Sequence, residues 1–194
     1  MIDSELALAA LLGELGPSSG YGITSIVRQR GMQRWAGLSP TSIYQGLRRL
    51  EARGLVSSAP DLAKRGRGPV GRLAALTPAG AELVRRELTA ALADAPEQST
   101  RYRIALAFVP QVGERIAIAQ LVARADALRA RARQVRLARA AGDGAMGGAA
   151  DGAAESAAES LGARLVFDYV LAALEHEIAV TERLTEILQE ARSS

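Results

Sequence analysis

Small hydroxyl side chains, an amide, a tyrosine and two arginines lie close together between residues 39 and 49. Hydroxyl and amide groups hydrogen-bond to base edges, whereas an arginine binds phosphate through its planar guanidinium. In a helix, these groups fall opposite or beside the apolar Ile43, Leu47 and Leu50. The residue types and spacing are therefore those of a helix that could approach a nucleic acid. The candidate residues are Ser39, Thr41, Ser42, Tyr44, Gln45, Arg48 and Arg49.

Basic residues gather around this cluster. From Arg28 to Arg72 there are ten basic residues and two acidic ones, a balance that favours a polyanionic partner. A loop rich in glycine and proline carries Lys64, Arg65 and Arg67, which could place cations along an adjacent groove. The alternative is an ordinary solvated arginine face, because 23 of the 24 basic residues of the chain are arginine.

Residues suited to catalysis are scarce. The chain has no cysteine, and its single histidine, His176, stands in a polar stretch typical of a solvated helix. No glycine-rich nucleotide-binding motif follows a predicted strand. We therefore expect no enzyme activity, no metal and no cofactor. No apolar run approaches the roughly 18 residues that a membrane span needs, and the acidic N-terminus has no basic region. These features predict a cytoplasmic protein that does not interact with membranes.

The elements that would position the basic cluster follow a recognisable order. Ser39 has the residue type of a helix N-cap, and Pro40 suits the first helical position. Gly54 is typical of the position just after a helix end. Three helices are predicted at residues 3–15, 21–30 and 39–53. Two strands follow at residues 55–58 and 72–76, and a fourth helix at residues 77–93. This is the order of a winged helix-turn-helix, in which a β-hairpin forms the wing.

The C-terminal half shows two long helical patterns. Residues 111–140 are mainly basic, residues 141–194 are mainly acidic, and residues 141–154 are rich in glycine and alanine, as in a flexible linker. The opposite charges indicate that the two helices could face each other. Apolar positions spaced near 3.5 residues predict coiled-coil packing. In the last helix these are Phe167, Leu171, Leu174, Ile178, Thr181, Leu184 and Leu188. Two such apolar stripes cannot both be buried in a lone hairpin, so we expect the protein to form a homodimer through the second helix.

Residues 6–88 resemble the PadR-like transcriptional regulators. The resemblance is carried by Gly20-Tyr21-Gly22-Ile23, Ser39-Pro40-Thr41-Ser42-Ile43-Tyr44, Leu47-Arg48-Arg49-Leu50-Glu51 and Leu76-Thr77-Pro78-Ala79-Gly80. It implies DNA binding, adds Tyr21 to the candidate DNA-binding residues, and implies dimerisation through the C-terminal helices. The chain departs from the family at the returning wing strand, where Leu73 and Ala74 replace a common tyrosine, and at Gln45, which replaces a common proline.

The predicted fold is mainly α with a small β-hairpin wing. Residues 1–95 form a winged helix-turn-helix DNA-binding domain, and residues 96–194 form a helical dimerisation and effector domain. The predicted function is an effector-responsive repressor that binds a palindromic operator as a homodimer. The alternative is a winged-helix adaptor whose basic face binds an acidic protein.

A small hydrophobic or aromatic effector is expected at the boundary between the two halves, where concave apolar sites are common. The chain has only seven aromatic residues, and several lie near this boundary. The predicted pocket residues are Trp35, Tyr102, Phe108 and Phe167. The alternative is that these rings only fill the aliphatic core.

Overall fold

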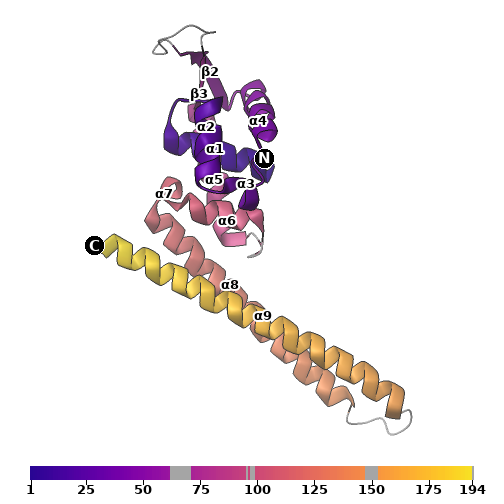
Figure 1. The fold of residues 1–194 in the computed structure, drawn as a ribbon. Coiled ribbons are helices and arrows are strands. Elements are labelled where there is room, and N and C mark those ends of the chain that lie inside the picture. The colour runs from indigo at the N-terminus through magenta and orange to yellow at the C-terminus, as the bar shows by residue number, and fades with distance from the viewer. Residues whose placement is uncertain (62–70, 95, 97–98, 147–152, 194) are drawn as a thin grey trace. The chain divides into compact units, whose positions relative to one another are not determined.

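The structure is a computed structural model that describes residues 1–61, 71–94, 96, 99–146 and 153–193, without the side chains of residues 141–146 and 153–160. The chain forms two compact units, Met1–Ala117 and Ile118–Ser194 (Figure 1). Within the described ranges, no helix is both long and apolar enough to cross a membrane.

Helix α1 (Asp3–Leu15) is the centre of the first unit. Every residue from Leu6 to Leu12 is at most 1% exposed, so the helix is buried on all sides rather than along one stripe. Its neighbours are α4, α5, α6, α7 and β3. The alanines among the leucines allow these neighbours to approach closely, so α1 is the support on which the other elements are positioned.

The helix-turn-helix consists of α2 (Gly20–Gln29) and α4 (Pro40–Ala52), with the one-turn helix α3 (Met32–Trp35) between them. The prediction for α4 is confirmed, since Ser39 is the N-cap, Pro40 is the first helical residue and Gly54 follows with a φ of 68°. The sequence pattern predicts only a turn before α4. The segment contains α3 because Met32 is fully buried and fixes it to the core.

The sheet has the order β1-β3-β2 and is antiparallel, with β1 at Ser18–Ser19, β2 at Val56–Pro60 and β3 at Arg72–Leu76. Both hairpin strands of the predicted wing are present. Strand β2 extends two residues beyond the prediction and ends at Pro60, which an edge strand tolerates because it does not need every N–H. The wing tip, with Lys64, Arg65 and Arg67, lies outside the described residues.

Three helices complete the first unit: α5 (Pro78–Asp94), α6 (Thr100–Ala107) and α7 (Val109–Val112). Both α6 and α7 pack against α1 and α5. For this reason the first unit continues to Ala117, whereas the sequence pattern places the domain boundary at residue 95. The two short helices are not predicted from the sequence.

Helices α8 (Glu114–Met146) and α9 (Ala153–Ser193) form an antiparallel helical hairpin in the second unit, and α8 begins in the first. Helical structure thus occupies both ends of the linker predicted at residues 141–154, and residues 147–152 lie outside the described residues. The apolar seam consists of Ala132, Leu171 and Leu174, with Leu128, Val135 and Val170 packed against it.

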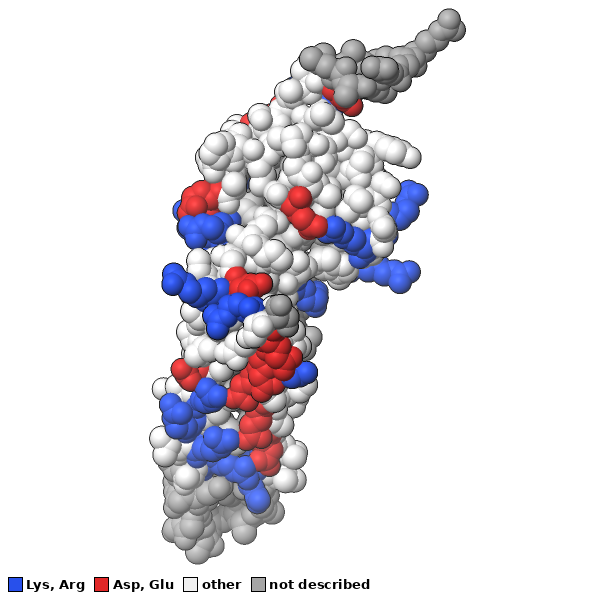
Figure 2. Space-filling model, turned by 90° about the vertical axis from the view of Figure 1, so that its left-hand side faces the viewer, with Lys and Arg blue, Asp and Glu red and all other residues white. Residues whose placement is uncertain are grey.

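The predicted pairing of the basic and the acidic helix is confirmed. Basic and acidic side chains lie side by side along the hairpin (Figure 2). Four arginines of α8 form ion pairs with four acids of α9: Arg124 with Glu177, Arg129 with Glu182, Arg136 with Glu175, and Arg139 with Asp168.

The seven positions predicted for dimerisation lie at or near the hairpin seam. Leu171, Leu174 and Thr181 are buried in the single chain. The other four positions, Phe167, Ile178, Leu184 and Leu188, are half-buried. The expectation that a lone hairpin cannot bury these stripes was therefore wrong for the central positions. The reason is that the stripe of α8, which includes Ala132, packs directly against them.

Candidate nucleic-acid interface

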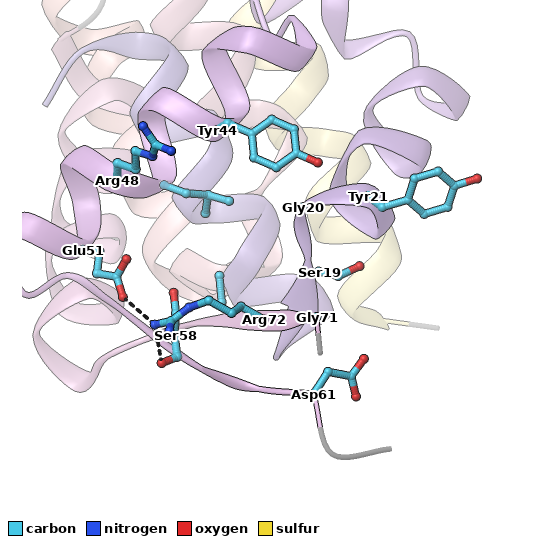
Figure 3. A pocket seen from close by; sticks show the side chains of 12 residues that line it. Ser19, Gly20, Tyr21, Tyr44, Arg48, Glu51, Ser58, Asp61, Gly71 and Arg72 are labelled. Atoms are coloured by element: carbon cyan, nitrogen blue, oxygen red, sulfur yellow. Dashed lines mark hydrogen bonds and ion pairs between the residues drawn. The ribbon is translucent and has the colours of Figure 1, made fainter. Parts of the chain in front are cut away.

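A groove of about 690 Å³ lies between helix α4, the start of α2 and the base of the wing (Figure 3). It contains two tyrosines and two arginines together with two acids, so its chemistry combines rings, cations and carboxylates. The lining residues with side-chain functional groups are Ser19, Tyr21, Tyr44, Arg48, Glu51, Ser58, Asp61 and Arg72. The groove thus brings together three of the predicted DNA-binding residues, Tyr21, Tyr44 and Arg48.

Both tyrosines of the groove are exposed to solvent. Tyr21 is 82% exposed and Tyr44 is 53% exposed. The ring of Tyr44 covers Gly20, where an added Cβ would lie 2.6 Å from Cε1 of the ring. Gly20 therefore lets the first turn of α2 approach α4, and both phenol groups remain accessible on the same face.

Helix α4 presents one polar face to solvent. Thr41 and Gln45 are exposed, and Arg48 borders the groove. The three are spaced by four and three residues, so they project from neighbouring positions of the helix. Within the described residues, no carboxylate forms an ion pair with Arg48. Its charge is therefore available to an anion outside the protein.

The hydroxyl groups of Ser39 and Ser42 accept hydrogen bonds from backbone N–H groups at the start of α4. The backbone N–H of Ser42 donates to Ser39 Oγ at 3.1 Å, and the N–H of Ser39 donates to Ser42 Oγ at 2.8 Å. This is a capping box, which satisfies N–H groups that the first turn of a helix leaves free. The two serines thus fix the start of α4, a role in addition to the DNA contact that the sequence predicts for them.

Arg49 has a partner that the sequence does not reveal. Its Nε donates to Glu5 Oε1 at 2.6 Å, across 44 residues of sequence. Glu5 is buried at the base of α1. The signal available in the sequence is weak, because Glu5 is one of three acids in α1 and is not distinctive until the neighbouring helix is known.

Arg72 links the wing to α4 and is also absent from the predicted site. Its Nη2 donates to the backbone oxygen of Ser58 at 3.1 Å and lies 3.5 Å from Glu51 Oε1. Figure 3 shows both contacts: the one with Ser58 lies within the sheet, and the one with Glu51 crosses from the sheet to the helix. The arrangement fixes the base of the wing beside the exposed face of α4.

Helices α1 and α2 are joined by a bidentate ion pair between Glu14 and Arg30, with N–O distances of 2.8 and 2.6 Å. The hydrogen bonds from Arg30 lower the pKa of Glu14, and partial burial of the carboxyl opposes this effect. The pair holds α2 at its C-terminal end, opposite the end that carries Tyr21.

The residues of the predicted effector pocket come from different elements. Tyr102 and Phe108 are buried in the core of the first unit. Trp35 is half-buried on α3 and donates through Nε1 to the backbone oxygen of Arg30 at 3.3 Å. Phe167 belongs to α9 of the second unit. Tyr102 and Phe108 thus have the burial of core side chains, and the effector pocket stays a prediction.

The order α1, β1, α2, α3, α4, β2, β3, α5 defines a winged helix-turn-helix, here followed by a long helical hairpin. Solved structures of Bacillus subtilis PadR are similar to the chain at 18% identity. The complex with operator DNA has a TM-score of 0.39 and the alignment covers 93% of this chain and 98% of that one. The complex with p-coumaric acid has a TM-score of 0.35, with 95% and 99% covered. A third PadR structure has a TM-score of 0.35, with 97% and 98% covered.

No protein-family model matches the chain, and no curated protein matches it. At 18% identity and these TM-scores, the similarity to PadR assigns no residue role to this chain.

Proposed function

We propose that this protein is a DNA-binding transcriptional regulator that acts as an effector-responsive repressor and binds a palindromic operator as a homodimer. The observation that carries the DNA-binding part is the exposed polar face of α4, where Arg48 has no ion pair among the described residues and Tyr44 borders the groove. A helix capped in this way and flanked by a wing is the arrangement that reads a major groove in winged helix-turn-helix proteins.

Thr41 and Gln45 supply hydrogen-bonding groups for base edges, and Arg48 supplies a cation for phosphate. Tyr21 and Tyr44 supply phenol hydroxyls, which donate to phosphate oxygens. Lys64, Arg65 and Arg67 complete the proposal at the wing tip, outside the described residues.

The test is a salt titration of DNA binding, followed by fluorescence anisotropy. The labelled duplexes carry either the DNA upstream of the protein's own gene or a shuffled sequence of the same composition. We expect tighter binding to the upstream duplex, and we expect Arg48→Ala to reduce the slope of log K against log salt by about 0.9, the loss of one phosphate contact. Arg85→Ala on α5 is the matched control and leaves the slope unchanged. Absence of wild-type binding to either duplex would favour the adaptor function, in which an acidic protein occupies the basic face.

The homodimer is supported by apolar side chains that the single chain leaves in solvent. Leu165 and Tyr169 of α9 are 61% and 76% exposed and lie four residues apart, and Leu161 continues the same row. Contiguous exposed apolar surface of this kind marks association sites. A single winged-helix unit also makes few base contacts, so a second copy on a paired half-site would supply the remaining specificity.

The effector is proposed to be a small hydrophobic or aromatic molecule. Trp35 provides the probe, because it is the only tryptophan of the chain and its fluorescence reports on nearby aromatic ligands. Titration with phenolic compounds and hydrophobic drugs should quench this fluorescence or raise the melting temperature. If neither changes across the panel, Trp35, Tyr102, Phe108 and Phe167 serve packing only.

A further inference from the structure

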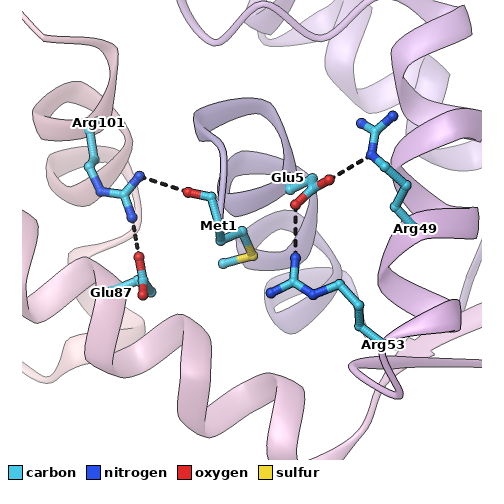
Figure 4. Close-up of polar contacts among 6 residues, drawn as sticks. All are labelled: Met1, Glu5, Arg49, Arg53, Glu87 and Arg101. Atoms are coloured by element: carbon cyan, nitrogen blue, oxygen red, sulfur yellow. Dashed lines mark hydrogen bonds and ion pairs between the residues drawn. The ribbon is translucent and has the colours of Figure 1, made fainter.

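The carboxylate of Glu5, in α1, forms ion pairs with two arginines at the C-terminal end of helix α4. Glu5 is only 5% exposed, and its two oxygens are used separately: Oε1 accepts from Arg49 Nε at 2.6 Å and Oε2 accepts from Arg53 Nη1 at 3.1 Å. Figure 4 shows the carboxylate lying between the two guanidinium groups. The arginines are four residues apart, so they project from the same side of α4.

This geometry restrains rotation of α4 about its own axis. A buried carboxylate that loses its partners is costly, because water cannot replace them. A helix rotates by about 100° per residue, so a turn of α4 sufficient to exchange neighbouring side chains would separate Glu5 from both arginines. The contact therefore specifies which side chains of α4 face α1 and which face solvent.

Helix α1 is itself fixed to the core at the same end. Arg101 of α6 donates to the backbone oxygen of Met1 at 3.1 Å and to Asp3 Oδ1 at 2.9 Å. The same guanidinium pairs with Glu87 of α5 (Figure 4). The N-terminal end of α1 is thus held by contacts with α5 and α6. Glu5 lies at this end, so its position is fixed relative to the core and can orient α4.

We propose that Glu5 is a positioning residue of the DNA interface. It holds Arg49 and Arg53 away from DNA phosphates and so orients the face of Thr41, Gln45 and Arg48 toward the DNA. The proposal rests on the proposed DNA-binding function. It differs from the sequence-based prediction, which places Arg49 among the DNA-contacting residues.

The test is the salt dependence of binding to a duplex of mixed sequence, measured for Glu5→Gln and for Glu82→Gln. Both variants remove one negative charge and release arginine from an ion pair, but Glu82 pairs with Arg85 within α5 and not with a residue of α4. We expect Glu5→Gln to steepen the slope of log K against log salt by about 0.9 for each arginine that gains a phosphate contact. We expect Glu82→Gln to match the wild type. A Glu5→Gln slope equal to the wild-type slope overturns the proposal.

A second set of variants does not depend on replacing a buried residue. Arg48→Gln, Arg49→Gln and Arg53→Gln alter side chains at the surface of α4, and circular dichroism checks that each variant is folded. The proposal predicts a slope reduced by about 0.9 for Arg48→Gln and an unchanged slope for the other two. Equal reductions for all three would overturn it while leaving DNA binding itself intact. If the wild type binds no duplex at low salt, the proposed function fails, and this inference fails with it.

Discussion

Gly80 offers a test in which local propensity and tertiary structure predict opposite signs. It lies in the first turn of α5, and replacing a helical glycine by alanine ordinarily stabilises a protein by about 0.4–1 kcal/mol. A Cβ at this position, however, would lie 2.1 Å from the backbone oxygen of Leu55 and 3.2 Å from Leu76 Cδ2. We therefore expect Gly80→Ala to destabilise the protein.

The magnitude follows from what must move. The Leu55 oxygen is a backbone atom and accepts the N–H of Thr77 at 3.1 Å, so it cannot turn aside as a side chain would. Thr77 Oγ1 also donates to the Gly54 oxygen at 2.8 Å and accepts from the N–H of Gly80 at 3.1 Å. Overpacking costs about 1–3 kcal/mol, and a weakened hydrogen bond adds about 0.5–1.5 kcal/mol. A loss of about 3 kcal/mol corresponds to a decrease of about 6–12 °C in melting temperature for a chain of this size.

The assay is thermal unfolding followed by circular dichroism, with urea unfolding as a second measure of stability. Gly162→Ala is the matched control, because Gly162 lies in α9 and, beyond its own helix backbone and its two neighbours, no atom of the described residues lies within 4 Å of its added Cβ. We expect Gly162→Ala to melt at or slightly above the wild-type temperature. The packing of α5 on the turn after α4 would be refuted if Gly80→Ala also melted at or above that temperature.

Three further predictions concern the helical hairpin and the α1–α2 ion pair. Leu174→Asp places a carboxylate in the buried seam at a cost of several kcal/mol, roughly, so helical content and melting temperature should fall; unchanged values would move Leu174 to the surface. Leu165→Asp should retain helical content but reduce the mass measured by light scattering to that of a monomer, and a dimer of unchanged mass would exclude this face from the interface. Glu14→Gln should lower the stability slightly near pH 7, by less than about 1 kcal/mol because both partners of the ion pair are partly exposed. Since the folded pKa of Glu14 is lowered, its contribution exists above the unfolded value of about 4.3 and is lost as the pH falls through the folded pKa, so the two proteins should converge in acid.

The sequence predicts the elements whose signals are local. Helix α4 is predicted with its cap, its proline and its terminal glycine, because each of these acts on the adjacent turn. Strand β3 is predicted with its observed bounds, Arg72–Leu76. The charge partition between the last two helices also identifies them as partners, because opposite charge on two long helices is visible in the residue types alone.

Features that depend on distant parts of the chain are not predicted. Helix α3 is a single turn that persists because Met32 is buried, and α6 and α7 are short helices held against α1 and α5. In the candidate site, the position of Arg48 on the polar face could be predicted from the helical period. The pairing of Arg49 with Glu5 could not, because 44 residues separate them and only the packing of α4 on α1 brings them together.

The distribution of charge between α8 and α9 restricts how copies of this chain can associate. Two α8 helices aligned along their paired sides would oppose arginine with arginine, and two α9 helices would oppose carboxylate with carboxylate. Like charges directly opposite each other are unfavourable, so these sides accept only the unlike helix. Self-association of α9 is thereby directed away from its ion-paired positions, and the exposed Leu165 and Tyr169 supply apolar surface outside those positions. The same four ion pairs that close the hairpin within one chain thus also limit which side of α9 is available to a second copy.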